Sequence, residues 1–281
     1  MRSKEAYLFL APAMVIFGVF LFYPMGKIIY YSFYDYNLLT PAIYTGFDNY
    51  ARLFRDENFL ACLGNSFIFI LVSPLLVVVS LLLALAVRDG GRGAKFLRLG
   101  YFLPVITPVV IAGIIWRWIY SEDTGILNYL LSNIGISPVA WLSEYPTNIA
   151  SVMILTVWRG FGYYMMIFLA GLAVIPAELE EAAKIDGAGR FQRVRMILIP
   201  LLLPSILFIM VISTASAVRI FTEQYILLPG VPLDNKAVVS FLFNEAFEQF
   251  RFGYASAAGV VLFVVTLGIS WLNIKMLERP E

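Results

Sequence analysis

The side chains that most often carry enzymatic chemistry are scarce in this 281-residue sequence. It contains no histidine, which excludes serine–histidine hydrolases, histidine-ligated metal sites and HExxH-type membrane proteases. Its one cysteine, Cys62, cannot form an intramolecular disulfide or a cysteine-built metal site, and we expect it to pack as a small hydrophobic residue. The acidic residues lie mostly outside the apolar runs, so no catalytic constellation is evident and we expect no enzyme.

Two arginines lie within long apolar runs, where a charged side chain is costly. An arginine near the centre of a bilayer costs roughly 2.5–3.5 kcal/mol on insertion scales, so it usually faces a polar pathway or a partner. Arg159 lies about ten residues into its run, with glycines and aromatic residues on both sides. Arg219 lies at the end of a later run, where extension to the membrane surface is the alternative. Both are candidates for a polar pathway.

The apolar runs are long enough to be membrane-spanning helices. Hydrophobic residues make up 60% of the chain and charged residues 14%, against about 25% charged in an ordinary soluble domain. A helix needs about 20 residues to cross about 30 Å of hydrocarbon. The sequence therefore predicts an all-α polytopic membrane protein, one domain over residues 1–281, with spans at about 6–31, 66–87, 99–120, 149–175, 197–220 and 253–276.

The placement of lysine and arginine orients the six predicted helices. If both termini are cytoplasmic, most basic residues fall in the short inside connections, as the positive-inside rule requires. The net charge of only +1 offers no basic face for phosphates, so nucleic acid is not an expected partner.

The longest cytoplasmic connection, residues 176–196, has the pattern of a short surface helix followed by a tight turn. Pro176 suits the first turn of a helix because its missing N–H is not needed there. Three glutamates follow, in the positive N-terminal part of the helix dipole. The segment Asp186-Gly187-Ala188-Gly189 then predicts a sharp turn, since glycine adopts backbone angles that other residues resist. The alternative is a connector without a partner.

The same connection carries a spaced motif: Glu181-Ala182-Ala183, then Gly187, then Ile197-x-Ile199-Pro200. This spacing resembles the EAA loop of binding-protein-dependent ABC importer permeases. The resemblance implies a type I importer permease fold, in which this loop is a coupling helix that docks into a cleft of a cytoplasmic ATPase. The residues that it assigns to ATPase coupling are Glu181, Ala182, Ala183, Asp186 and Gly187.

Other stretches resemble the carbohydrate-uptake branch of that family. They are Gly46-Phe-Asp-Asn-Tyr-Ala-Arg-Leu, Leu103-Pro-Val-Ile-Thr-Pro-Val-Val, Trp116 with Gly125-Ile-Leu-Asn128, and Ala170-Gly-Leu-x-x-Ile175-Pro176. The likeness covers about residues 5–277 and is greatest to the maltose-transporter F-like or glycerol-phosphate-transporter A-like half. One departure is Leu227-Leu-Pro-Gly-Val-Pro232, where the family often has Thr-x-Gly-Gly-Pro. We therefore carry over no binding-protein contacts for the outer loop 223–252.

The resemblance implies a permease subunit of an ATP-driven importer for a sugar or sugar derivative, in the bacterial cytoplasmic (inner) membrane. The implied partners are a second permease in a heterodimer, two cytoplasmic ATP-binding subunits and an extracytoplasmic solute-binding protein. No GxxxxGK[ST] phosphate loop occurs in the chain, so ATP is expected on the partner subunits, with no cofactor or metal here. A six-helix secondary transporter or channel is the competing hypothesis, because it would also lack this motif.

The resemblance also proposes a substrate pathway. In the maltose-type relatives a glycine and a tyrosine before the coupling loop line the sugar site, and they match Gly160 and Tyr163. A polar position in the fifth span matches Ser213, whereas two others fall on Ala217 and Ile220. With Arg159 and Arg219, whose guanidinium groups suit sugar hydroxyls or an acidic group on a sugar, these residues form the predicted pathway. Helix packing is the alternative role for Gly160 and Tyr163.

Overall fold

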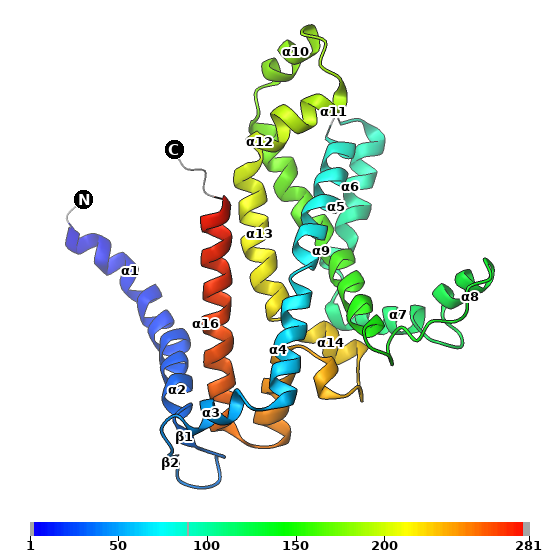
Figure 1. Ribbon diagram of the computed structural model, residues 1–281. Helices are drawn as coiled ribbons and strands as arrows, with labels where there is room; N and C mark the ends of the chain where they lie inside the picture. The colour runs from blue at the N-terminus through cyan, green and yellow to red at the C-terminus, as the bar shows by residue number, and fades with distance from the viewer. Residues whose placement is uncertain (1–2, 89, 278–281) are drawn as a thin grey trace.

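The computed structural model describes residues 3–88 and 90–277 and confirms a mainly helical chain. Long helices stand side by side in a bundle, and short helices and loops cover its two ends (Figure 1). Among the described residues, strands are limited to β1 (Tyr34–Asp35) and β2 (Ile43–Tyr44), which pair antiparallel. In the same part of the chain, four helices are long and apolar enough to cross a membrane, or six if each of two bent pairs is one crossing.

The first helical run stands at the edge of the bundle. It consists of α1 (Ser3–Phe17), the π-helical turn η1 (Gly18–Phe22) and α2 (Tyr23–Tyr31). Its apolar stretch Phe9–Tyr31 is not buried by the rest of the chain. Figure 1 shows α1 leaning away from the other helices, while α2 lies beside α16 (Phe252–Leu277). The run therefore has one face left for lipid or another subunit.

The centre of the bundle is formed by α5 (Val72–Val87) and α9 (Thr147–Val174), which pack along each other. With α4 (Glu57–Phe69), α5 makes a helical run over Glu57–Val87 that begins well before the expected residue 66. Asp56 caps α4 by accepting a hydrogen bond from the Phe59 N–H (3.2 Å), which explains this earlier start. The core around α5 and α9 contains fully buried Phe69, Leu155 and Phe168.

The span predicted over residues 99–120 is bent rather than continuous. The chain forms α6 (Arg92–Ile106) and α7 (Val109–Ile119), which meet at an angle of 98°. Thr107 between them is extended (ψ 125°), because the ring of Pro108 disfavours helical geometry in the preceding residue. As a result α7 runs across the end of the bundle rather than along it (Figure 1).

The expected helix over residues 197–220 is also bent. Its first part is α11 (Arg190–Arg193), the π-helical turn η2 (Val194–Leu198) and α12 (Ile199–Leu201), and its second part is α13 (Leu203–Val218). The two parts meet at 67° near Leu202, where Pro200 and Pro204 remove two helical N–H donors. The chain is thus helical from Arg190 onward, before residue 197, where the predicted span begins.

The two ends of the bundle differ in what they carry. One end holds α10 (Ala177–Ile185), and the start of α1 and the end of α16 lie toward that end (Figure 1). The other end holds the remaining short elements. These are α3 (Asp48–Leu53), α8 (Ile126–Ser132), α14 (Thr222–Leu227), the 3-10 turn η3 (Leu233–Asn235), α15 (Val238–Phe243) and the π-helical turn η4 (Asn244–Glu248).

Candidate functional site

A cavity of about 340 Å³ lies between α5, α9 and the end of α13. Four of the five predicted pathway residues line it: Arg159, Gly160, Ser213 and Arg219. Its other walls come from Val72, Leu76, Val105, Thr156, Tyr164, Ser216, Ala217, Ile220, Phe221, Thr222 and Glu223. Ala217 and Ile220, which occupy the positions expected to be polar in relatives, thus also face this cavity. We call it the central cavity.

The central cavity lies where helices end, so unpaired backbone groups contribute to its polarity. Helix α13 stops at Val218, and the chain then turns into α14. Arg219 follows directly, and its Nε donates a hydrogen bond to the Ala215 carbonyl (2.9 Å), one of the carbonyls that the end of the helix leaves unpaired. Its side chain is exposed, so its remaining N–H groups can reach a ligand.

Arg159 forms an ion pair that sequence reasoning missed. Its Nη1 lies 2.5 Å from Glu223 Oε1, and the two side chains are 26% and 15% exposed. Arg159 Nε is buried and has no hydrogen-bond partner among the described residues. Glu223 lies on α14, just after the fifth expected span, so a search for acids inside the spans could not find it. The feature of the sequence that could have pointed to Glu223 is its position as an isolated acidic residue in a mainly apolar stretch.

Gly160 serves packing as well as lining the cavity. A Cβ there would lie 2.9 Å from Leu76 Cδ2, so the glycine lets α9 approach α5. Tyr163 does not line the central cavity and is 45% exposed, whereas the neighbouring Tyr164 does line it. The two rings meet edge to face, with centroids 5.2 Å apart. Within this chain the tyrosine at the cavity is therefore Tyr164.

Helix α10 and its turn have the geometry expected from the sequence. Pro176 precedes the helix, which begins at Ala177. Gly187 has φ +84°, in the left-handed region that glycine tolerates. Two backbone hydrogen bonds close the turn, from Asp186 N–H to the Ala182 carbonyl (2.9 Å) and from Ala188 N–H to the Ala183 carbonyl (2.8 Å).

The surface of α10 exposes apolar side chains beside its charged ones. Glu181, Ala182, Asp186 and Gly187 are exposed and Ala183 is half-buried. Two large side chains accompany them, Leu179 at 44% and Ile185 at 87% exposure. Glutamates in the first turn suit the positive end of the helix dipole. Large apolar side chains exposed on a short helix outside the bundle are typical of a segment that docks into another protein.

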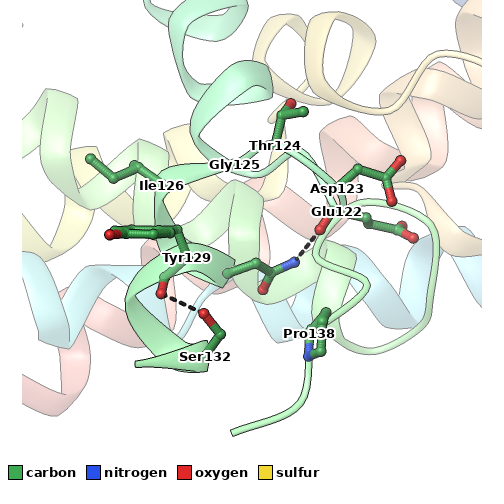
Figure 2. A pocket seen from close by; sticks show the side chains of 9 residues that line it. Glu122, Asp123, Thr124, Gly125, Ile126, Tyr129, Ser132 and Pro138 are labelled. Carbon is green, nitrogen blue, oxygen red and sulfur yellow. Dashed lines mark hydrogen bonds between the residues drawn. The ribbon is translucent and has the colours of Figure 1, made fainter. Parts of the chain in front are cut away.

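A second hollow, of about 450 Å³, lies in the connection between α7 and α8 and contains no predicted site residue (Figure 2). The Asn128 amide beside it holds the connection together. Its Nδ2 donates to the carbonyls of Glu122 (3.1 Å) and Val139 (3.0 Å), and its Oδ1 accepts from the Val139 N–H and the Trp141 indole. Gly125 is required because a Cβ there would lie 2.3 Å from the Ser121 carbonyl oxygen. The likeness at Gly125–Asn128 therefore has a structural cause.

The outer loop 223–252 is anchored to the bundle. Asn65 on α4 donates to the carbonyls of Asp234 (2.6 Å) and Lys236 (3.1 Å), and buried Gln224 accepts from the Ala237 N–H (2.9 Å). Burial raises the pKa of the Glu245 carboxyl above its ordinary value, and the guanidinium of Arg251, 2.7 Å away, opposes this shift. These contacts fix α14, and with it Glu223, beside the central cavity.

Comparisons with known proteins identify several similar chains. Residues 62–274 match the family described as "Binding-protein-dependent transport system inner membrane component". The diacetylchitobiose uptake system permease protein NgcF of Streptomyces coelicolor is 35% identical over 275 residues, which are 92% of this chain and 78% of that protein. The arabinooligosaccharides transport system permease protein AraP of Bacillus subtilis is 32% identical, over 98% of this chain and 89% of that protein. Among solved structures, a chain of a bacterial ABC transporter involved in the import of the acidic polysaccharide alginate has a TM-score of 0.85 at 25% identity, covering 98% of this chain and 96% of that one.

Proposed function

This chain belongs to the family of binding-protein-dependent transport system inner membrane components, and from that membership we propose that it is the permease subunit of an ATP-driven saccharide importer. The observation that carries the proposal is α10, a short helix with exposed Leu179 and Ile185 at the end of the bundle toward which the start of α1 and the end of α16 lie (Figure 1). An importer driven by a separate ATPase needs such a docking element, whereas a secondary transporter or channel does not.

The proposed partners follow from this arrangement. Cytoplasmic ATP-binding subunits dock on α10, with Glu181, Ala182, Ala183, Asp186 and Gly187 at the contact. A second permease completes the pathway, which the open, arginine-lined side of the central cavity and the unburied face of α1 and α2 both favour. An extracytoplasmic solute-binding protein delivers substrate at the opposite end. Both termini and α10 then lie on the cytoplasmic side of the inner membrane, in agreement with the positions of the basic residues.

The proposed substrate is a saccharide. The relatives named above are uptake permeases for diacetylchitobiose and arabinooligosaccharides, and the structural neighbour belongs to an alginate importer. The central cavity suits this class, because it combines an aromatic residue, Tyr164, and apolar walls with hydroxyl and guanidinium groups. We assign Arg159, Gly160, Ser213 and Arg219 to the pathway, together with Glu223 and Tyr164. Tyr163 belongs to it only if its exposed ring meets the second permease.

The proposal is tested by reconstituting the complex with its ATPase and binding protein, and by measuring saccharide uptake and ATP hydrolysis. Arg219→Ala should weaken apparent substrate affinity while basal ATP hydrolysis continues. Arg117→Ala is the matched control, because Arg117 is exposed on α7 and does not line the central cavity. Glu181→Lys should weaken copurification of the ATPase. Saccharide uptake that continues without ATP or the ATPase would contradict the proposal and favour a secondary transporter.

A further inference from the structure

A cluster of charged side chains joins α10 to the cytoplasmic ends of two other helices. Arg88, at the end of α5, places Nη2 2.7 and 2.6 Å from the two carboxylate oxygens of Glu180 on α10. Arg193 on α11 lies 4.0 Å from the same carboxylate. All three side chains are mostly buried, with exposures of 24%, 17% and 17% in the order Arg88, Glu180, Arg193. We call these three residues the clasp.

We propose that the clasp holds α10 rigidly on the end of α5, so that a movement of α10 reaches the wall of the central cavity directly. Glu180, Arg88 and Arg193 are thus positioning residues for ATP-driven transport, distinct from the residues that meet the ATPase. The inference rests on the proposed function, because it assigns α10 the role of the driven element.

Without the clasp, α10 would depend on its two connections. On one side the chain is extended at Ile175 and Pro176, and on the other it passes through the turn at Gly187 and Gly189. Such non-helical connections bend more easily than the helices that they join. Charge favours the clasp from both sides: Arg88 lies at the negative end of the α5 dipole and Glu180 in the positive first turn of α10.

Helix α5 connects the clasp to the cavity. Val72 and Leu76 of α5 line the central cavity, and the same unbroken helix reaches Arg88. Arg98 on α6 fixes its far end by donating from Nη2 to the carbonyls of Val87 (2.5 Å) and Arg88 (3.3 Å), which the helix end leaves unpaired. Ser80 Oγ also donates to the Phe161 carbonyl of α9 (3.0 Å). A rotation of α10 is therefore transmitted to the cavity through α5, a continuous helix that packs against α9.

Spin labels test the rigidity directly in the assembled complex. Labels at Ala177→Cys on α10 and Leu82→Cys on α5, both exposed positions, are placed in a Cys62→Ala background. The distance between them should be narrowly distributed and unchanged by ATP binding, and Glu180→Gln should broaden it. A distance that changes on ATP binding, or a Glu180→Gln distribution as narrow as that of the parent protein, would overturn the proposal.

A charge exchange tests what the clasp does for transport. Arg88→Glu should lower the ratio of substrate-stimulated to basal ATP hydrolysis roughly fivefold or more, the usual lower range of coupling between sites. Adding Glu180→Arg should recover part of this ratio, and only part, because Arg193 then faces a like charge. Lys95→Glu is the control: Lys95 is exposed on α6 and forms no ion pair within the described residues. A ratio in the double variant that is no higher than in Arg88→Glu alone would contradict the proposal.

The two experiments separate failure of the clasp from failure of the proposed function. The spin-label distance needs no substrate, so it reports on the clasp even in a complex that transports no saccharide. A rigid distance without uptake of any saccharide would refute the proposed function and leave the clasp standing. Uptake with an unconstrained α10 would refute the clasp alone.

Discussion

Glycine positions in α9 show how a single hydrogen atom in place of a side chain sets the helix arrangement. A Cβ on Gly162 would lie 2.0 Å from the carbonyl oxygen of Tyr101, a backbone atom that cannot move without moving α6. Gly160, two residues earlier, faces a different helix: its added Cβ would lie 2.9 Å from the end of the Leu76 side chain on α5. Gly162 is therefore the stricter requirement, although sequence reasoning singled out Gly160.

We expect Gly162→Ala to destabilise the protein by about 1–3 kcal/mol, the usual cost of overpacking a tight contact. The measurement is thermal unfolding of the purified protein. Gly64→Ala is the matched control, since nothing lies within 4 Å of the Cβ that it adds to α4. Equal unfolding temperatures for the two variants would show that α6 and α9 separate more easily than their contact indicates.

The pair of Arg159 and Glu223 should be coupled energetically. Removing one partner leaves the other charge partly buried and unpaired, so Arg159→Met or Glu223→Gln alone should cost roughly 1–3 kcal/mol. The double variant should cost less than the sum of the two single changes, by about 0.5–3 kcal/mol. Chemical unfolding of all four proteins measures the difference. Strict additivity would mean that the two charges are independently solvated.

At the scale of helices, features that neighbouring residues specify could be predicted from the sequence, and features that depend on distant contacts could not. The turn after α10 was predictable because Gly187 and its neighbours specify it without help from distant residues. The breaks near Pro108 and Leu202 involved prolines visible in the sequence, yet their angles of 98° and 67° depend on packing against helices far along the chain. The Arg159–Glu223 pair was missed for the same reason: only the fold brings α14 back beside α9.

The turn at the end of α10 gives a sharp comparison between two glycines. Gly187→Val should impair ATPase association and uptake without loss of membrane insertion, because a β-branched residue is strained at φ +84°. Gly189→Val is the control, since Gly189 has φ −66° and ψ 166°, which valine adopts readily. Copurification of the ATPase and saccharide uptake are the measurements. Similar behaviour of both variants would mean that the turn geometry does not matter for docking.

On the scale of the whole molecule, the end that carries α10 should face the cytoplasm. In a Cys62→Ala background, Gly189→Cys should react with impermeant thiol reagents only after the cells are opened. Leu39→Cys, in the exposed loop between β1 and β2, should react in intact cells. The reason is the accumulation of basic residues at the α10 end. Labelling of Gly189→Cys in intact cells would reverse the orientation and remove α10 from the reach of an ATPase.

The right-angled pair of α6 and α7 has a consequence for the lipid around the protein. Because α7 runs across the bundle, the stretch of α6 that lies along it beyond its last charged residue, Arg98, covers residues 99–106, a length of about 12 Å at the usual rise per residue. A bilayer core of about 30 Å is much thicker than that, so acyl chains beside α6 must shorten or tilt to cover it. We expect uptake in proteoliposomes to be fastest in short-chain lipids and to slow as the acyl chains lengthen.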